Sequence, residues 1–350
     1  MWGKKVGFSC VCAFVILGQF PLAVAQTKQA AGASADDVYS RQFQVENDLF
    51  VGGHTDRWYT NGLRYSWTYK GAPTNGFLRD LHAIPRKFGL LGETGSHAYS
   101  IGQSMYSPRD IGSALPQAQD RPWSGFLYLS MGADGYKDSE YQSNEVKIGV
   151  TGYASLADAA QIEWHRIIGS RYPAGWPLQT HIRPVVQFTH AKVNRQQDLI
   201  KDLLGWQTSY GFGLGNARVY GNASASVLLG KLKKDDAPLL IANEGDFTVH
   251  DVNRREMYKS LFGFASIGAQ AVGYNYFIEG PTPYVSDIRT MPTVGTAQLG
   301  FSVPIWKSTN PGVRLVFTVN ARTSEFQTIS TGASGGVQRW GSFTFVVAPM

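Results

Sequence analysis

Alternation of apolar and polar residues limits the possible folds of this chain more than any other feature. In GLRYSWTYK (62–70), the odd-numbered positions from Leu63 to Tyr69 are apolar or aromatic, while polar or charged residues stand between them. VRLVFTVNAR (313–322) has the same pattern, with Val313 and Phe317 on its apolar face. A period of two places one set of side chains on each face of a β-strand, so both segments predict strands with one apolar face.

Helical membrane crossing is excluded by the same sequence. After the first 25 residues, the chain contains no apolar run of the roughly 18 residues that a transmembrane helix needs. The composition is 13% aromatic and 17% charged, with 39 glycines. Two classes remain, a soluble all-β protein and a transmembrane barrel whose strands are about 10 residues of weak alternation.

Twelve segments predict strands, and no linker or second domain separates them. An even number is what a closed antiparallel barrel with both chain ends on the periplasmic side requires. We therefore predict an all-β fold, a twelve-stranded antiparallel transmembrane β-barrel spanning residues 26–350. The predicted strands lie near 38–48, 59–70, 97–106, 123–133, 144–153, 180–192, 207–215, 217–231, 257–279, 292–305, 312–327 and 339–348.

The first 25 residues predict a signal peptide. Lys4 and Lys5 precede an apolar run that closes on Ala23-Val24-Ala25, a pattern typical of signal-peptidase cleavage. Both cysteines, Cys10 and Cys12, lie in this segment, so we expect a mature chain without disulfides. Export together with the strand pattern predicts the bacterial outer membrane.

The charge balance excludes one class of partner. Removal of residues 1–25, which carry two lysines and no acidic residue, lowers the formal net charge from +6 to +4. Because no basic stripe with interleaved aromatics is present, we expect no nucleic-acid partner. The small positive surplus suits an anionic membrane surface or a phosphorylated lipid, and we expect the barrel to act as a monomer among outer-membrane lipids.

One segment, 155–169, departs from the strand pattern. Its apolar residues recur at helical spacing, and Gly169 is suited to end a helix. We therefore predict a short helix in an extracellular loop. The apolar stripe consists of Leu156, Ala160, Trp164 and Ile167, and the opposite, polar face carries Asp158, Gln161 and His165.

Unusual polar residues gather at one end of the predicted barrel. If the first strand runs outward, the loops 49–58, 107–122 and 154–179 all lie at the extracellular rim. These loops and the strand ends beside them carry Asn47, Asp48, the segment 56–61 and His165. Solvated loops are also polar, but we would expect a surface without function to scatter such residues over both ends. The clustering favours a functional rim.

Five motifs carry a resemblance to a known family. VENDLF (45–50), TDRWYTNG (55–62), YSPRDI (106–111), DRPWSGFLY (120–128) and HRIIGSRYPAGWPLQ (165–179) occur in this order and in register with the predicted strands. Together they resemble the outer-membrane lipid A 3′-O-deacylases, from about Val38 to the end of the chain. The resemblance implies a twelve-stranded barrel with a calcium-dependent esterase site that removes the 3′-linked acyloxyacyl group of lipid A in lipopolysaccharide.

The resemblance also implies roles for individual residues. Asn47 and Asp48 would belong to the active site, with Asp48 as a Ca²⁺ ligand, Thr60 nearby and His165 as the general base. A hard cation prefers oxygen ligands, which carboxylates and carbonyl groups supply. Ca²⁺ would polarise the ester carbonyl while the imidazole takes a proton from water, so no nucleophilic serine is needed.

Two positions depart from the family pattern. Leu49 and Arg171 stand where the family member compared most closely has acidic residues. We expect Asp56, Glu46 or Glu163 to supply the missing carboxylate as a metal ligand, or a site with a single Ca²⁺ and no second metal position. For Asp56, an ion pair with Arg57 remains an equal alternative.

Three arginines at the rim are candidates for docking lipid A phosphates, because a guanidinium group matches phosphate oxygens. They are Arg57, Arg109 and Arg121. Each also has an acidic neighbour with which it can pair instead, namely Asp56, Asp110 and Asp120.

Two other functions remain open from sequence. An outer-membrane phospholipase is also calcium-dependent, but would carry a Ser-His pair, and no serine stands in a motif with His165. A barrel that only binds or transports would use the same rim residues for gating or structure, and would leave lipid acyl chains intact.

Overall fold

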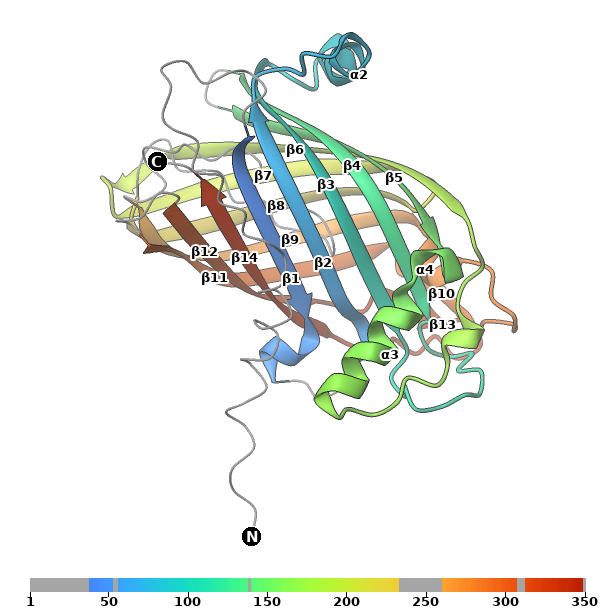
Figure 1. The fold of residues 1–350 in the computed structure, drawn as a ribbon. Coiled ribbons are helices and arrows are strands. Elements are labelled where there is room, and N and C mark those ends of the chain that lie inside the picture. Colours follow the sequence, from blue (N-terminus) through green and yellow to red (C-terminus); the bar gives the residue numbers. More distant parts are fainter. Residues whose placement is uncertain (1–37, 53–55, 138–139, 233–259, 307–311, 349–350) are drawn as a thin grey trace.

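A closed antiparallel barrel forms the body of the protein (Figure 1). The computed structural model describes residues 38–52, 56–137, 140–232, 260–306 and 312–348. The predicted signal peptide, 1–25, lies outside the described residues. Twelve strands are hydrogen-bonded in the order β1-β14-β12-β11-β9-β8-β7-β6-β5-β4-β3-β2. The prediction of a twelve-stranded antiparallel barrel is thus confirmed.

Each observed barrel strand overlaps one of the twelve predicted segments, with the largest difference at the end of β6, which lies eight residues beyond its prediction. The barrel strands are β1 (Val38–Asn47), β2 (Trp58–Lys70), β3 (Glu93–Ser107), β4 (Ser124–Lys137), β5 (Glu140–Thr151), β6 (Pro184–Ile200), β7 (Leu204–Gly215), β8 (Arg218–Lys231), β9 (Leu261–Asn275), β11 (Thr293–Trp306), β12 (Gly312–Arg322) and β14 (Gln338–Ala348).

Three of the predicted strands extend four or five residues too far at the rim, and one of them, predicted from residue 180, begins only at Pro184. The segment predicted as 257–279 leaves the barrel after Asn275 and forms the short helix α4 (Tyr276–Glu279), which the Asn275 side chain caps by accepting from Phe277 N at 3.0 Å. The segment predicted as 312–327 ends its barrel strand at Arg322. The remaining short strands, β10 (Ile288–Thr290) and β13 (Phe326–Thr328), pair with each other in a separate two-stranded sheet.

Alternation along each strand sorts side chains between lumen and membrane. In β2, Leu63 and Tyr65 are exposed outward, while Arg64 and Ser66 are buried in the lumen. Arg64 donates to Glu145 Oε1 at 2.5 Å and to Ser100 Oγ at 2.9 Å. The inside is therefore polar and hydrogen-bonded, and the outside is apolar, as a barrel in lipid requires.

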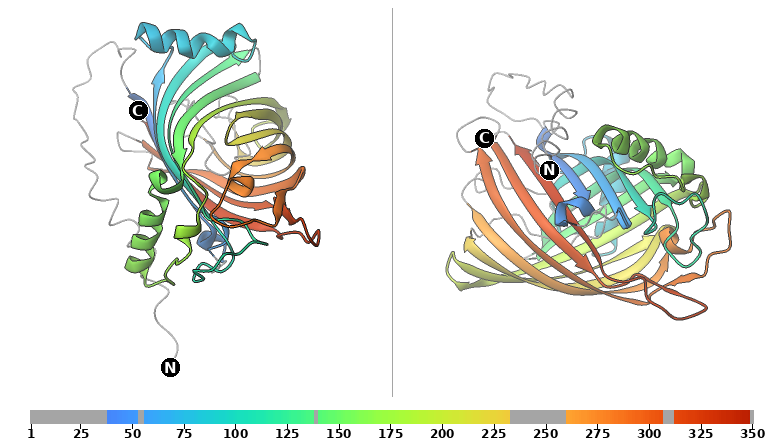
Figure 2. Two further views of the ribbon diagram at one scale, coloured as in Figure 1. Left: turned by 90° about the vertical axis from the view of Figure 1, so that its right-hand side faces the viewer. Right: turned by 90° about the horizontal axis from the view of Figure 1, so that it is seen from below.

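The two ends of the barrel carry different elements. At one end lies α2 (Gly76–Lys87), close to the ends of the described chain, Val38 and Ala348 (Figures 1 and 2). At the other end lie η1 (Asp48–Val51), η2 (Gly152–Ser155), α3 (Ala157–Ile168), η3 (Trp176–Leu178), α4 and the β10-β13 sheet. In the orientation expected from sequence, the α2 end is periplasmic and the α3 end is extracellular.

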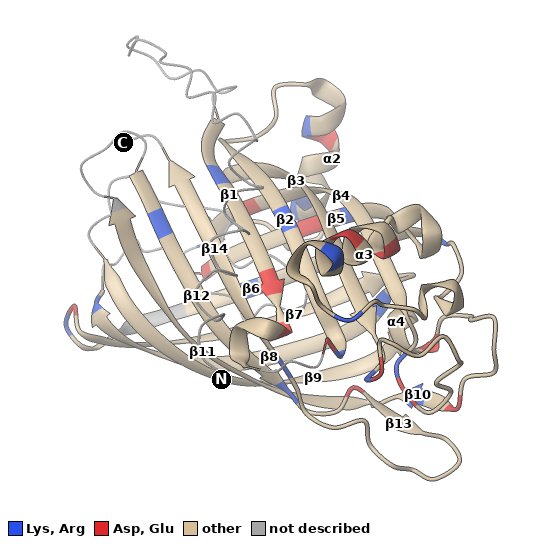
Figure 3. Cartoon of the chain, turned by 60° about the horizontal axis from the view of Figure 1, so that its bottom comes forward, with Lys and Arg blue, Asp and Glu red and all other residues tan. Residues whose placement is uncertain are grey.

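Charged residues are prominent around α3. Figure 3 shows acidic and basic residues on α3 and on the loops beside it, while long stretches of the strands carry none. None of the described helices is both long and apolar enough to cross a membrane.

Candidate active site on the outer wall

A short 3-10 helix turns the chain outward after the first strand. Asn47 caps η1, because its Oδ1 accepts a hydrogen bond from Leu49 N at 2.8 Å. Phe50 packs edge-on against Phe343, with ring centroids 5.0 Å apart, on the outer face of β14. Gly52 ends the turn with φ of +79°, a conformation that glycine adopts without strain. The turn thus places Asp48 on the lipid-facing side of the wall.

Asp48 is a buried carboxyl group with an unsatisfied oxygen. Its side chain is 2% exposed. Oδ2 accepts from Arg57 N at 3.0 Å, whereas the buried Oδ1 has no hydrogen-bond partner among the described residues. Burial, and then the nearby charge of Asp56, raises the pKa of Asp48 to about 8. Two carboxylates that lie close together in a buried site repel each other, so the pair favours binding of a proton or a cation between them.

Hydroxyl groups hold the turn that presents Asp56. This residue has a positive φ of 39°. Its carbonyl oxygen accepts from Ser107 Oγ at 2.5 Å and from Thr60 Oγ1 at 3.3 Å, and the two hydroxyls are also bonded to each other. Thr60 therefore lies beside the predicted site, where it fixes the Asp56 backbone. Ser107, which ends β3, has the same function and was not identified from sequence.

The predicted helix is present as α3, and its polar face is the one that is buried. Gln161 and His165 are both 3% exposed and face the barrel, whereas Leu156 and Ile167 of the predicted apolar stripe are exposed. Gln161 Oε1 accepts from Trp176 Nε1 at 2.8 Å, which ties the helix to η3. As predicted, His165 lies on the polar face opposite the apolar stripe, and this polar face is the one buried against the barrel. In a membrane protein, an apolar stripe can face lipid while the polar face packs on protein.

The imidazole of His165 is oriented by the chain that follows the helix. Its Nδ1 lies 2.5 Å from the carbonyl oxygen of Arg171. A carbonyl only accepts, so Nδ1 carries a proton, and in the neutral ring the lone pair is on Nε2. Nε2 lies 3.7 Å from Asp56 Oδ2. The Arg171 guanidinium pairs with Asp110 at 2.7 Å, which anchors this segment to the neighbouring loop.

The structure separates the three candidate metal ligands of the sequence analysis. Glu46 points into the lumen, where Tyr59 Oη donates to its Oε2 at 2.5 Å. Glu163 is exposed and pairs with Arg166 at 2.5 Å. Only Asp56 lies beside Asp48. Among the described ranges, no group of three or more His, Cys, Asp or Glu side chains is arranged to hold one metal ion.

The Asp48–Asp56 pair nevertheless suits a hard cation. Asp48 Oδ1 is buried and has no partner among the described residues, and both side chains offer oxygen, the donor that Ca²⁺ prefers. The other ligands of such an ion would be carbonyl oxygens, water or a substrate oxygen.

The three rim arginines have different surroundings. The Arg57 guanidinium lies 5.1 Å above the Trp58 ring. Arg109 is exposed; Asp110, its acidic neighbour, is paired with Arg171. Both remain candidates for contact with phosphate.

Arg121 differs, because its side chain is completely buried. It forms an ion pair with Glu325 at 2.7 Å, and Glu325 also pairs with Arg322 at 2.9 Å. The carboxylate of Asp120 accepts instead from Trp58 Nε1 at 2.8 Å. A side chain with no exposed surface cannot dock a lipid phosphate, so the prediction for Arg121 is wrong.

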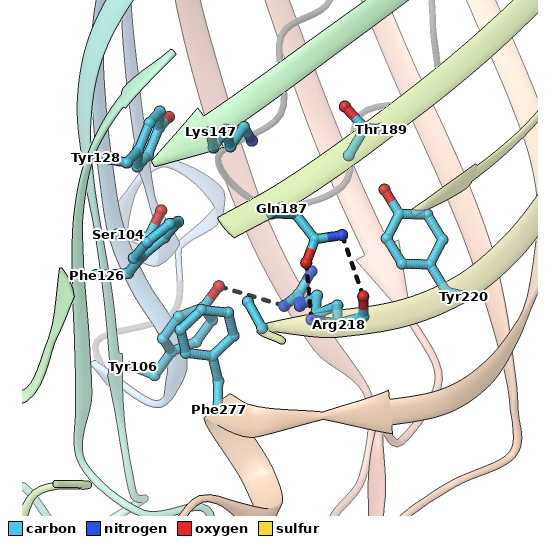
Figure 4. A pocket seen from close by; sticks show the side chains of 11 residues that line it. Ser104, Tyr106, Phe126, Tyr128, Lys147, Gln187, Thr189, Arg218, Tyr220 and Phe277 are labelled. Atoms are coloured by element: carbon cyan, nitrogen blue, oxygen red, sulfur yellow. Dashed lines mark hydrogen bonds between the residues drawn. The ribbon is translucent and has the colours of Figure 1, made fainter. Parts of the chain in front are cut away.

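A polar and aromatic pocket lies on the other side of the same wall. It is a partly open pocket with about 380 Å³ of free space, open solvent included, and Tyr106, Tyr128, Lys147, Arg218 and Phe277 are among its lining residues (Figure 4). Arg218 donates to Tyr106 Oη at 3.2 Å. This pocket opens in the lumen, whereas Asp48, Asp56 and His165 lie on the outer wall under α3. The lumen pocket is therefore separate from the cluster of two carboxyl groups and one imidazole on the outer wall.

The fold and the polar cluster on its lipid-facing wall define a bacterial outer-membrane β-barrel. The model of the family described as outer membrane protein LpxR matches residues 8–348. The chain therefore belongs to the LpxR family of outer membrane proteins, and it resides in the bacterial outer membrane.

One solved structure of the same family name shares the barrel fold. LpxR from Salmonella typhimurium superposes with a TM-score of 0.68 at 20% identity, covering 88% of this chain and 99% of that one. The translocator domain of autotransporter NalP from Neisseria meningitidis matches with a TM-score of only 0.37 at 12% identity, over 98% of this chain and 97% of that one. No curated protein matches the sequence.

Proposed function

We propose that this protein is a lipid A 3′-O-deacylase, an ester hydrolase that removes the 3′-linked acyloxyacyl group of lipid A with Ca²⁺ as cofactor. Membership of the LpxR family supports a lipid A deacylase-type function. The observation that carries the proposal is the position of Asp48, Asp56 and His165 together on the outer wall of the barrel. A lipid in the outer leaflet meets this wall directly.

His165 is the proposed general base. With its proton on Nδ1, held by the Arg171 carbonyl, the lone pair of Nε2 faces the site. Nε2 accepts a proton from water as the water oxygen bonds to the ester carbonyl carbon. The bond between the carbonyl carbon and the sugar oxygen then breaks. The sugar oxygen receives the proton from His165 and leaves as a hydroxyl group.

The other predicted residues support this reaction. The Asn47 Oδ1 is used in the cap of η1, and its amide nitrogen, unpaired among the described residues, is free to donate to an oxyanion. Thr60 holds the Asp56 carbonyl and acts as a positioning residue. Asp48 and Asp56 would hold Ca²⁺, which, when bound, supplies Lewis-acid polarisation of the ester carbonyl. Arg57 and Arg109 would contact the lipid A phosphates.

The surroundings of His165 distinguish this proposal from a phospholipase with a Ser-His pair. Its two ring nitrogens face the Arg171 carbonyl and the Asp56 carboxylate, and no serine hydroxyl of the described chain is bonded to it.

Mass spectrometry of lipid A from cells with and without the protein tests the proposed activity. We expect the loss of one acyloxyacyl group, dependent on Asp48 and His165. Unchanged lipid A would instead favour a barrel that binds or transports. Loss of acyl chains from glycerophospholipids, with lipid A intact, would identify a phospholipase.

A further inference from the structure

The helix α2 is docked on the outside of the barrel wall. His82, in the middle of the helix, is 3% exposed, and its ring lies 5.9 Å from that of His97 on β3. His97 in turn stacks on Tyr69 of β2 at 5.1 Å. Tyr69 has the same strand parity as Leu63 and Tyr65, which are exposed to the membrane side. The contact is therefore with the lipid side of the wall.

Strand register extends this argument around the barrel. Cross-strand pairing joins five outward positions in one row: Tyr69, His97, Ala133, Asn144 and His190. The last four are at most 6% exposed although they face outward. The segment after α2 helps to cover this row, since Leu90 O accepts from Asn144 Nδ2 at 2.9 Å.

The lipid-facing belt of the barrel begins close by. Ile101, Leu129 and Ile148 form the row four residues further along the same strands, and they are 44%, 62% and 62% exposed. Four strand residues span about 13 Å. The helix thus lies against the wall at the border of the apolar belt, the depth at which the membrane interface is expected.

A ridge of large apolar side chains is left exposed on α2 and at its end. Phe77 and Phe88 are 77% and 75% exposed, and Leu81 and Ile84 stand between them at 37% and 42%. The spacing of four, three and four residues puts all four on one helix face. This face lies beside the one that carries His82 and the buried Pro85.

The opposite side of α2 is basic. Helical periodicity places Arg79 and Arg86 roughly opposite the ridge, and Lys87 adds a third cation against the single acid Asp80. An apolar face with cations on the other side is typical of helices that lie in a membrane interface beside anionic lipid headgroups.

We propose that α2 is an interfacial helix whose Phe77–Phe88 ridge is inserted into the phospholipid of the periplasmic leaflet, with its cations directed to anionic headgroups. The occupant of the exposed ridge is the bilayer itself, because the helix is continuous with the lipid belt of the wall. The inference is independent of the catalytic proposal.

Nitroxide labelling in vesicles tests this depth. The full chain with Cys10→Ser and Cys12→Ser has no cysteine, so single labels can be placed at Phe77→Cys, Ile84→Cys and Phe88→Cys. Arg79→Cys and Arg86→Cys are matched controls on the same helix, and Leu129→Cys is the reference for the lipid belt. Each variant is reconstituted in vesicles of zwitterionic and anionic phospholipid, and retained heat-modifiable mobility shows that the barrel is folded.

We expect the ridge labels to relax faster with dissolved oxygen than with an aqueous nickel chelate, as at Leu129, and the two arginine sites to show the reverse order. Ridge labels as accessible to nickel as the arginine sites would overturn the proposal. Ridge labels immobilised and shielded from both relaxants would also overturn it, because they would indicate contact with a second copy of the chain. Ile84→Cys provides the answer if either phenylalanine variant does not fold.

Discussion

The imidazole Nε2 of His165 lies 3.7 Å from Asp56 Oδ2, although the two residues belong to different loops at the barrel rim. The hydroxyl groups of Thr60 on β2 and Ser107 on β3 hold the loop that carries Asp56. The helix that carries His165 is held by contacts to β4 and η3. The site is thus assembled from independent segments, each of which can be tested by itself.

Replacement of His165 tests the general base. His165→Ala should lower the rate of 3′-deacylation by about a hundred- to ten-thousand-fold, the usual contribution of a positioned base. His165→Gln should be nearly as inactive, since an amide accepts no proton at neutral pH. Release of the acyl group by purified variants in detergent measures both. Arg166→Ala, an exposed change on the next residue, is the control that should keep the activity. Near-normal activity of the Gln variant would remove His165 from this role.

Calcium affinity should depend on pH through Asp48. The folded, metal-free protein holds this carboxyl with a pKa of about 8. Below that pH the group is protonated, and Ca²⁺ must displace the proton. The affinity should therefore rise about tenfold per pH unit between pH 6 and 7 and level off above pH 8. Titration calorimetry in two buffers of different ionisation enthalpy should detect close to one released proton at pH 6.5. An affinity independent of pH would contradict Asp48 as a ligand.

Asp48→Asn should separate metal binding from folding. Because the Asp48 carboxyl is neutral in the metal-free protein below pH 8, the amide resembles its resting form. At pH 6 to 7 without metal, the variant should unfold at a temperature equal to or above that of the wild type. Ca²⁺ should stabilise the wild type and leave the variant unchanged. The measurement is thermal unfolding followed by the gel shift of the barrel, with and without a chelator. A variant that Ca²⁺ stabilises like the wild type would place the ion elsewhere.

Ser107→Ala should weaken the site without disturbing the barrel. It removes the 2.5 Å hydrogen bond to the Asp56 carbonyl, a loss of about 1 kcal/mol, equivalent to about a fivefold decrease in Ca²⁺ affinity. Ser104→Ala is a matched control on the same strand, because Ser104 faces the lumen. Equal effects of the two changes would show that the hydroxyl of Ser107 has no special role.

The two accessible arginines should affect substrate binding and not chemistry. Arg57→Ala and Arg109→Ala are expected to raise KM for lipid A several-fold at unchanged kcat, and to have little effect on lipid A that lacks phosphate. Steady-state kinetics on both substrates measures this. A fall in kcat at constant KM would instead assign these residues to the reaction itself.

Glu325→Gln should destabilise the rim, because it leaves Arg121 and Arg322 without a buried counter-charge. Breaking such a pair costs about 3–5 kcal/mol. We expect a lower unfolding temperature for the purified barrel. Glu163→Gln, which breaks an exposed pair, should change it little.

The sequence predicted the barrel well because a strand between lumen and lipid exposes alternate residues to two different environments, as β2 and β12 do. It predicted the rim less well. Tyr276, Phe277 and Ile278 read as a continuation of β9, but all three are buried at the rim, where Phe277 stacks on Tyr106 of β3 and none of the three faces lipid, so the alternation of a barrel strand no longer applies. The pairing of Arg121 with Glu325 joins positions far apart in the chain, and no local pattern indicates it.

Within the candidate site, the sequence motifs predicted which residues come together, but not how α3 is oriented on the barrel. Asp48, Asp56 and His165 do lie together, as their shared rim predicted. The two faces of α3 were predicted, but not that the polar one would be buried, because hydrophobicity alone does not distinguish a face against protein from a face against lipid. Ser107 and the Arg171 carbonyl act through a hydroxyl and a backbone atom, which carry little sequence signal.

The position of the Asp48–His165 cluster on the outer wall also determines how a substrate reaches it. A lipid already in the outer leaflet arrives by lateral diffusion and never crosses bulk water or enters the lumen. The effective concentration is then the mole fraction of the substrate in the leaflet. Diluting lipid A with inert lipid at constant bulk concentration should slow the reaction, whereas diluting the whole suspension should not.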